Sequence, residues 1–443
     1  MNTQLRDSCG TKAEPGAICL RFPPVKLGTT SQSKLNLSSN DWWAKLSSKF
    51  PTESTLKFPG GMVALDGANI TVIPNVSGKY SFRLPMVDVQ DSEGVDVTFQ
   101  ITVYPDPKTI PIVEKPTPEG PYWKKDVDSF LEIFAKMNLY VIGASRRGLS
   151  HLADGKFRDD DMCVEKISDT AFVVAVADGA GSAKYSREGS KIAVVATKDF
   201  LKTELSNETF AEFDKTPWAE VLIKSAKNAY DKICSASKER GQIVGGYEEK
   251  WIKGFNTTLL VAVVYTVPNG DVNIVSFSVG DGAIVWHSGA RTELMSACDS
   301  GQYAGETLFL TARSVWRELE ASRSDFISKR IKHISIQGSE LKAGTLVLMS
   351  DGVSDPFFAT HDELRSSVEW SKFFAAKGLV DIKRKGTDES VKEELEEWLK
   401  FDGGAGHYDD RTIICVFPQQ PNDNVLAEEP ALAENSDIAT DKE

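Results

Sequence analysis

Aspartates at the ends of apolar runs are the residues of this sequence with the clearest potential for chemistry. Three runs finish in Asp-Gly, with the acids at Asp178, Asp281 and Asp351. A single Asp-Gly is more simply a turn, since both residues favour the backbone conformations that follow a strand. Two further acidic clusters precede apolar strands: residues 159–161 come before the run that ends at Asp178, and residues 409–410 come directly before RTIICVF. This repetition predicts a shared site.

Carboxylates that converge at strand ends repel one another unless cations hold them together. Oxygen ligands with few His or Cys residues nearby select hard cations such as Mg²⁺ or Mn²⁺ rather than zinc. We therefore expect a magnesium or manganese site that is built from aspartates distant in sequence.

The elements that must position these acids follow from hydrophobic periodicity. Apolar runs predict strands at residues 140–142, 171–177, 258–266, 271–279, 283–287, 331–336, 345–350 and 412–417. Apolar residues spaced three and four apart predict helices at residues 126–137, 186–205, 217–234, 363–375 and 389–400. Strands in hairpin-like succession, with helices gathered between groups of them, favour an α+β fold with antiparallel sheets flanked by helices.

The chain divides into five predicted segments. Residues 1–50 read as an irregular and flexible N-terminal segment, and residues 51–106 as a small all-β domain with immunoglobulin-like strand spacing. In the run from Val95 to Tyr104, apolar and polar residues alternate, which is typical of a strand with one wet face. Prolines make residues 107–125 a semi-rigid linker to the main domain at 126–418, and residues 419–443 form an acidic, disordered tail.

Charge and composition exclude several classes of protein. The net charge of −13 argues against a grip on nucleic acid, which needs clustered Lys and Arg. The six cysteines are scattered without a CxxC pair, so neither a zinc knuckle nor a disulfide framework is predicted. No apolar run approaches ~18 residues, and the N-terminus lacks a basic start followed by a hydrophobic stretch. We expect a cytoplasmic protein without a membrane partner.

The order of the acidic motifs resembles that of the metal-dependent protein phosphatases of the 2C type, in their bacterial branch. The motifs occur in the order RDDD, VADGAGSA, FNTTLL, SVGDG, MSDGVSD and YDDRTIICV, across roughly residues 138–418. The resemblance implies a four-layer α-β-β-α sandwich, in which two antiparallel sheets pack face to face with helices outside. It also implies that two cations, or three, lie in a cleft at one end of that sandwich.

The resemblance also implies a role for each acid. Asp178 matches the carboxylate that bridges both metals, and Gly179 the residue whose carbonyl binds one of them. The other expected metal ligands are Asp351, Asp409 and, for a third metal, Asp281. Asp159 and Asp160 match an acidic pair that orients metal-bound water, and Asp410 stands where the family usually has Asn. Asp355, four residues after Asp351, is a further acid that could reach the metals through water, although its neighbour Pro356 equally marks an ordinary turn.

The function that this resemblance implies is hydrolysis of phosphoserine or phosphothreonine on proteins. Paired cations lower the pKa of a bound water, so that hydroxide attacks phosphorus without a covalent intermediate. The expected partners are a phosphorylated protein substrate and a cognate Ser/Thr kinase, in bacterial signalling or stress defence. The alternative is a weak or inactive phosphatase-like module that binds a phosphoprotein or partner, with the β-domain as its docking surface.

Two departures from the family pattern bear on catalysis. Family members usually grip the phosphate with an Arg five residues before the second acid of the first motif, where this chain has Gly155. Arg158 and Arg147 are the expected substitutes, although loop cations are more often simply solvated. Arg146 and Lys156 are further candidates. Ala180 replaces a His that serves many eukaryotic relatives as general acid, which leaves metal-bound water, His151 or His407 to protonate the leaving group.

Overall fold

The computed structural model describes most of the chain between residues 18 and 419. The described residues are 18–22, 25–26, 32–36, 46–48, 53–66, 69–88, 94–110, 112–113, 123–206, 218–244, 248–289, 291–297, 299, 307–321, 324–376, 378–385, 388–403 and 407–419. Apart from Gln419, the predicted acidic tail lies outside them, as does the middle of the predicted linker.

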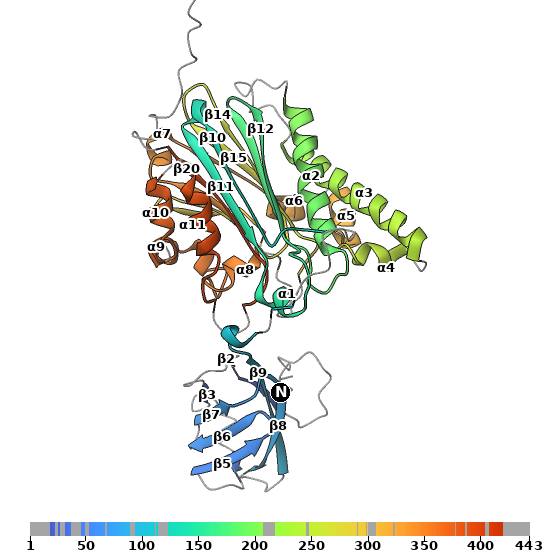
Figure 1. Cartoon of the computed structure of the whole chain (residues 1–443), viewed down its shortest axis with the longest axis vertical. Coiled ribbons are helices and arrows are strands. Elements are labelled where there is room, and N and C mark those ends of the chain that lie inside the picture. Colours follow the sequence, from blue (N-terminus) through green and yellow to red (C-terminus); the bar gives the residue numbers. More distant parts are fainter. Residues whose placement is uncertain are drawn as a thin grey trace, which may run out of the picture.

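Two antiparallel sheets form the large C-terminal unit, as predicted (Figure 1). The first has the order β10-β11-β20-β19-β16-β17, with bounds Val127–Phe134, Leu139–Arg146, Arg411–Pro418, Thr345–Met349, Ala283–His287 and Thr292–Leu294. The second has the order β12-β13-β14-β15-β18, with bounds Asp161–Ser168, Ala171–Ala177, Leu259–Thr266, Val272–Val279 and Ile331–Ile336.

Helices cover the outer face of each sheet, so the layers run helix, sheet, sheet, helix. On the second sheet pack α2 (Ser186–Leu205), α3 (Trp218–Val244), α5 (Arg313–Glu320) and α6 (Ser324–Arg330), with α4 (Glu248–Lys253) after α3. On the first sheet pack α8 (Asp351–Ser354), α9 (Ser367–Ala376), α10 (Leu379–Lys385) and α11 (Ser390–Trp398). The remaining short helices are α1 (Leu149–Ala153) and α7 (Gly338–Leu341), with 3-10 turns at Pro107–Thr109, Ala135–Met137 and Glu363–Arg365.

Strand β13 shows why the sandwich buries both faces of each sheet. Its residues alternate between two hydrophobic clusters: Phe172, Val174 and Val176 face the opposite sheet, while Val173 and Ala175 face the helices α2 and α3. Successive side chains of a strand point to opposite faces, so a strand between two apolar layers needs an unbroken apolar run. The uninterrupted sequence AFVVAVA meets that need.

The predicted helix at residues 126–137 is wrong. Val127–Phe134 is instead the edge strand β10, which pairs along its whole length with β11, and only Ala135–Met137 forms a 3-10 turn. Apolar residues at 127, 130, 131 and 134 have the spacing of a helix face, but the ladder with β11 satisfies the backbone of this segment as a strand. Tertiary pairing overrides the local pattern here.

A smaller β-unit precedes the sandwich and contains two sheets. One has the order β1-β9-β8-β4, with β2 also on β9; the bounds are Ile18–Arg21, Gly94–Tyr104, Gly78–Asp88, Leu46–Ser48 and, for β2, Val25–Lys26. The other has the order β3-β7-β6-β5, with bounds Ser33–Asn36, Asn69–Pro74, Gly61–Asp66 and Glu53–Phe58. In β9 the predicted alternation holds from Val97 to Val103, whose apolar side chains are buried.

The prediction that residues 1–50 are irregular needs correction, because described parts of this segment supply β1, β2, β3 and β4. These strands are short and carry little periodic signal, and their partners β7, β8 and β9 lie some 30 to 80 residues away. The pairing that makes them strands is therefore invisible in their own sequence. The immunoglobulin-like class of this unit stays a prediction.

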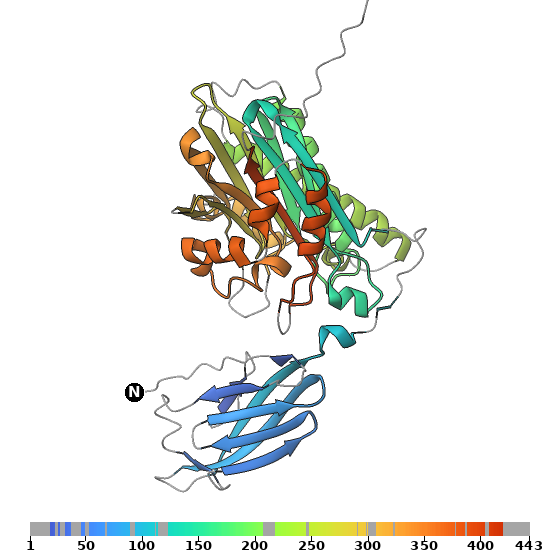
Figure 2. The ribbon, with the colours of Figure 1, turned by 60° about the vertical axis from the view of Figure 1, so that its left-hand side comes forward.

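The β-unit lies below the end of the sandwich that carries α1 and α8 (Figure 1), and it is also below the sandwich in the view of Figure 2. The Tyr408 hydroxyl donates to the Pro105 carbonyl (2.8 Å), and the Tyr104 and Tyr408 rings meet edge to face. The Val113 amide donates to the Leu152 carbonyl of α1. Over the described residues, no helix is both long and apolar enough to cross a membrane.

Replacement of Phe172 by alanine tests the packing between the sheets. Phe172 is fully buried, and its ring stacks on that of Phe134 with the ring centroids 4.1 Å apart. Phe172→Ala should therefore lower the free energy of unfolding by about 3–5 kcal/mol. Val368→Ala, on an exposed side chain of α9, should change it by less than ~0.5 kcal/mol. Urea denaturation of both variants measures the difference, and equal losses would contradict the layer arrangement.

Candidate metal centre

Acids from both sheets meet at one rim of the sandwich. Asp178 directly follows β13, Asp281 lies between β15 and β16, and Asp351 directly follows Ser350 at the end of β19. In an antiparallel ladder the end of one strand lies beside the start of the next, so Asp161 of β12 pairs with Ala177, and Met349 pairs with Ile413 of β20. The motifs that precede β12 and β20 therefore reach the rim where β13 and β19 end.

Asp178, Asp281 and Asp351 form the tightest group at this rim. One carboxylate oxygen of each lies within 4.8 Å of the others, and all three residues are half-buried. Burial, and then the neighbouring carboxylates, raise the pKa of Asp178 and of Asp351 well above the ordinary value. Burial also raises the pKa of Asp281. The structure thus brings together three of the predicted metal ligands.

Asp409 and Asp160 lie beside this group. Asp409 is an exposed residue, and its Oδ1 accepts from the Asp410 amide (2.8 Å). The protein that surrounds its carboxyl, together with the charges of Asp410 and Asp281, nevertheless raises its pKa. Asp160 is buried, its Oδ2 accepts from the Thr412 hydroxyl (2.6 Å), and burial followed by the Asp410 charge raises its pKa to about 7. Both carboxylates also act on the pKa of Asp178.

Three buried carboxylate oxygens of the site have no hydrogen-bond partner among the described residues. They are Asp159 Oδ1, Asp281 Oδ1 and Asp351 Oδ1. A buried acceptor without a donor costs about 1–3 kcal/mol, more when it is charged, so such oxygens call for a cation. The donor set is all oxygen, which suits Mg²⁺ or Mn²⁺, and the residues present therefore fit the divalent metals that the sequence predicts.

Asp410 has a different environment from the other acids. It is 2% exposed and accepts from the amides of Gly148 (2.6 Å), Asp159 (2.5 Å) and Asp160 (3.4 Å) and from His151 Nδ1 (3.0 Å). Burial opposes its charge, but the hydrogen bond and charge of His151, together with the amides, lower its pKa. Asp410 is thus a stable buried anion that joins three loops.

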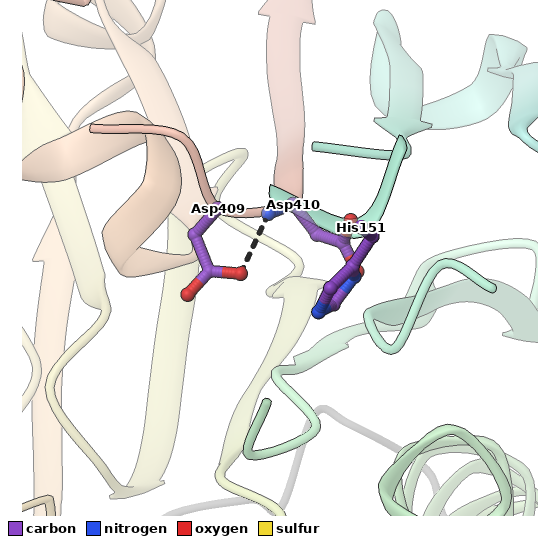
Figure 3. A group of neighbouring side chains, drawn as sticks. All are labelled: His151, Asp409 and Asp410. Atoms are coloured by element: carbon purple, nitrogen blue, oxygen red, sulfur yellow. Dashed lines mark hydrogen bonds and ion pairs between the residues drawn. The ribbon is translucent and has the colours of Figure 1, made fainter. Parts of the chain in front are cut away.

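His151 lies beside Asp410 (Figure 3) and carries the positive charge of this pair. Although burial disfavours the imidazolium, the hydrogen bond to Asp410 and the charges of Asp410 and Asp159 raise the pKa of His151 to about 9. Its Nε2 lies 3.6 Å from Asp159 Oδ2. Burial raises the pKa of Asp159 to about 6. The His151 charge opposes this shift, and the Asp410 charge adds to it. His151 and Asp410 lie 259 positions apart in sequence, and no local pattern links them.

Two glycines of the Asp-Gly motifs are required because other main chain lies too close for a side chain, and not because a turn needs them. Neither Gly179 nor Gly352 has a positive φ. A Cβ on Gly179 would lie 2.6 Å from the Asp159 carbonyl oxygen, and one on Gly352 would lie 1.8 Å from that of Asp410. Main chain from separate motifs is therefore packed in direct contact at the rim.

The Asn-Thr-Thr motif at 256–258 fixes the main chain of Asp178. The Thr257 hydroxyl and the Thr258 amide both donate to the Asp178 carbonyl, at 2.9 and 2.8 Å, and the Asp178 amide donates to the Thr258 hydroxyl. This motif is therefore a support for the site.

The two predicted phosphate-gripping arginines are buried and already bonded. Arg147 donates to Asp126 Oδ1 (3.1 Å) and to the carbonyls of His151 and Val113. Arg158 donates to the Ser145 carbonyl (2.8 Å), with Asp128 Oδ2 at 3.8 Å. Phosphate binding by either stays a prediction, and these contacts give both a supporting role.

The other sequence candidates lie around the site. Lys156 is exposed and pairs with Asp154, and Arg146 is half-buried at the end of β11. His407 is half-buried, and burial followed by the Arg411 charge lowers its pKa. Asp355 is an exposed residue, but the protein around its carboxyl, followed by the Asp281 charge, raises its pKa to about 6. Asp355 thus belongs to the same electrostatic group as the predicted ligands.

The raised pKa values predict that the metal-free protein loses stability as pH rises. Asp159, Asp160 and Asp355 have folded pKa values of about 6, 7 and 6, above the ordinary value near 4, so their favourable protonation in the fold is lost between pH 4 and 7. His151 acts in the same direction as pH rises towards 9.

We therefore expect the denaturation midpoint in EDTA to fall between pH 5 and 8, and Mn²⁺ to restore it at pH 8. One pKa unit corresponds to about 1.4 kcal/mol, so the effect is measurable by urea denaturation. A midpoint that rises with pH in EDTA would contradict the crowding of carboxylates at the rim.

Several solved structures are distantly similar to this chain. A search of curated proteins finds no match to the chain. Among solved structures, a bacterial serine phosphatase is 16% identical with a TM-score of 0.37, covering 67% of this chain and 98% of its own. Stp1 of Staphylococcus aureus, a serine/threonine phosphatase, is 15% identical with a TM-score of 0.36, covering 69% and 97%. RsbX in complex with magnesium is 14% identical with a TM-score of 0.33, covering 63% and 94%.

The family described as Protein phosphatase 2C matches residues 147–400, which is more than half of the chain. That stretch contains β12, β13, β19 and the acids at 159, 160, 178, 281 and 351. The chain belongs to the protein phosphatase 2C family.

Proposed function

We propose that this protein is a Mn²⁺- or Mg²⁺-dependent protein phosphatase that hydrolyses phosphoserine and phosphothreonine monoesters. The observation that carries the proposal is the set of aspartates from separate strand ends whose carboxylates converge at one rim, with buried oxygens that have no donor in the described part of the chain. A fold gains nothing from such crowding without a cation, because like charges close together destabilise it. Family membership supports the same reaction.

Each acid has a proposed task. Asp178, Asp351 and Asp409, with the Gly179 carbonyl, would hold two cations, and Asp281 would serve a third. Divalent cations bound there supply an activated water and neutralise charge on the phosphoryl oxygens. Asp160, fixed by Thr412, and Asp159, beside His151, would orient that water through hydrogen bonds to their carboxylates.

His151 and Asp410 hold this arrangement in place. Asp410 accepts from the amides of both Asp159 and Asp160, so it fixes the peptide that carries the two water-orienting acids. The imidazolium of His151 compensates the buried charge of Asp410 and lies beside Asp159. Without this positive charge, the Asp410 carboxylate would add to the repulsion at the rim.

The proposed substrate is a phosphorylated protein, with a cognate Ser/Thr kinase as partner, in bacterial signalling or stress defence. The net charge of −13 disfavours nucleic acid as a partner, and a cytoplasmic location is part of the proposal. The β-unit, which we interpret as immunoglobulin-like, would dock the substrate or an assembly. Its contact through Tyr104 and Pro105 with Tyr408 places it next to the loop of Asp409.

A second candidate function is a regulatory module that binds a phosphoprotein without turnover. It is favoured by the two predicted phosphate-gripping residues, Arg147 and Arg158, because both are buried and their terminal guanidinium nitrogens already contact protein acceptors. The absence of a His at position 180 points the same way. Binding of Mn²⁺ without phosphate release would support this candidate over the enzyme.

Substitution of Asp178 tests the proposed reaction. We expect Asp178→Asn to lower Mn²⁺-dependent hydrolysis of p-nitrophenyl phosphate and of a phosphothreonine peptide by more than about a hundredfold, because loss of even a supporting partner of a metal ligand costs about 10- to 100-fold. Removal of one repelling charge should leave the metal-free protein as stable or more stable.

The matched control is Asp169→Asn, the same change in the turn at the other end of the β12–β13 hairpin, where Asp169 pairs with Lys136 and Lys166. It should keep the wild-type rate. An unaffected rate in Asp178→Asn would remove the proposed metal chemistry, and a wild-type protein that binds Mn²⁺ but releases no phosphate would favour the regulatory module.

A further inference from the structure

A buried lysine lies behind the acidic loop of the site. Lys124 precedes β10 and is 8% exposed, although lysine is among the residues most rarely buried. Burial lowers its pKa, and the nearby Asp161 carboxylate opposes that shift. Neither the predicted roles nor the family resemblance involve this residue.

The Lys124 ammonium contacts the main chain of both water-orienting acids. Its Nζ lies 2.8 Å from the Asp160 carbonyl oxygen, 3.4 Å from that of Asp159 and 3.1 Å from the Ser190 hydroxyl. The Ser190 hydroxyl in turn donates to the Asp159 carbonyl (2.5 Å). The fourth contact, at 3.0 Å, is to Asp161 Oδ2. The ammonium is therefore surrounded by acceptors of residues 159–161 and by Ser190.

The same two residues meet a negative charge on their amide side. Asp410 Oδ2 accepts from the amides of Asp159 and Asp160, while Lys124 donates to their carbonyls. The segment thus lies between a buried cation and a buried anion. The cation faces the negative carbonyl ends of its peptide groups, and the anion faces the positive amide ends. Charge-assisted hydrogen bonds of this kind are about twice as strong as neutral ones.

This clamp sets the distance between the acidic loop and the metal ligands. A Cβ on Gly179 would lie only 2.6 Å from the Asp159 carbonyl oxygen, so that carbonyl, which Lys124 and Ser190 hold, packs directly on the main chain after Asp178. A shift of the Asp159–Asp160 main chain would displace the Asp160 carboxylate from Thr412 and from Asp178. Metal sites lose function when a ligand moves by about 1 Å.

We propose that Lys124 is a positioning residue for the metal centre, which orients Asp159 and Asp160 through their carbonyls and so determines how tightly the site binds divalent cations. This inference rests on the metal site of the proposed function. The competing explanation is that Lys124 merely neutralises Asp161, in which case its effect would pass through that carboxylate and not through the carbonyls.

The test is calorimetric titration of the full chain with Mn²⁺ alone, which needs no turnover. We expect Lys124→Met to raise the Kd for Mn²⁺ by about 10- to 100-fold, the usual cost of losing a partner that orients metal-bound groups. Asp161→Asn removes the ion pair but keeps the carbonyl contacts, so its Kd should stay within about threefold of wild type. Lys198→Met removes a half-buried lysine that pairs with Glu165 of β12, and it is the matched control for loss of an ammonium. Its Kd for Mn²⁺ should likewise stay close to the wild-type value.

A second readout separates positioning from general destabilisation. At saturating Mn²⁺, Lys124→Met should lower kcat for p-nitrophenyl phosphate with little change in KM, because Lys124 is buried and its ammonium contacts the acidic loop. If Lys124→Met does not fold, Lys124→Gln, which keeps a donor on a shorter side chain, takes its place with a smaller rise in Kd expected.

The outcomes decide between the explanations. A wild-type Kd in Lys124→Met, equal losses in Lys124→Met and Asp161→Asn, or failure of both Lys124 variants to fold would each overturn the positioning role. If the wild-type protein itself binds no Mn²⁺, the proposed function fails instead, and the two failures are distinguishable.

Discussion

Repulsion between carboxylates is the constraint on which the rest of this structure depends. Oxygens of Asp178, Asp281 and Asp351 lie within 4.8 Å of one another, and Asp160 and Asp409 add their charges nearby. In partly dehydrated surroundings such a group is unstable unless protons or cations neutralise it. The sandwich holds it because the acids extend from β-strands anchored in two hydrophobic layers, while Asp410, His151 and the Thr257–Thr258 pair fix their main chains.

The fold was predictable where a strand or helix carries its own signal. The run AFVVAVA predicts a strand with both faces buried, and 171–177 is β13 residue for residue; the helix at 186–205 likewise matches α2. Prediction failed where pairing decides the structure. Residues 127–134 have helical spacing but complete a sheet edge, and the strands within residues 18–48 depend on partners much later in the chain.

The candidate site divides in the same way. Asp-Gly at three strand ends was visible because the chemistry and the strand end are adjacent in sequence, and the structure brings those three acids together. The supporting contacts were not visible. His151 and Asp410, or Lys124 and the Asp159 and Asp160 carbonyls, meet only after the sheets have formed, and a lone loop His or Lys has no sequence feature that distinguishes support from solvation. The glycines of the motifs likewise allow main chain from distant parts of the sequence to pack closely against them.

Crystals of the full chain grown with Mn²⁺, with anomalous diffraction recorded at the manganese edge, test the central claim most directly. We expect anomalous peaks in the space enclosed by Asp178, Asp281 and Asp351, with Asp409 at its border. This expectation would be contradicted by peaks confined to surface carboxylates elsewhere, or by Asp178, Asp351 and Asp409 turned towards separate regions of solvent while Mn²⁺ is abundant.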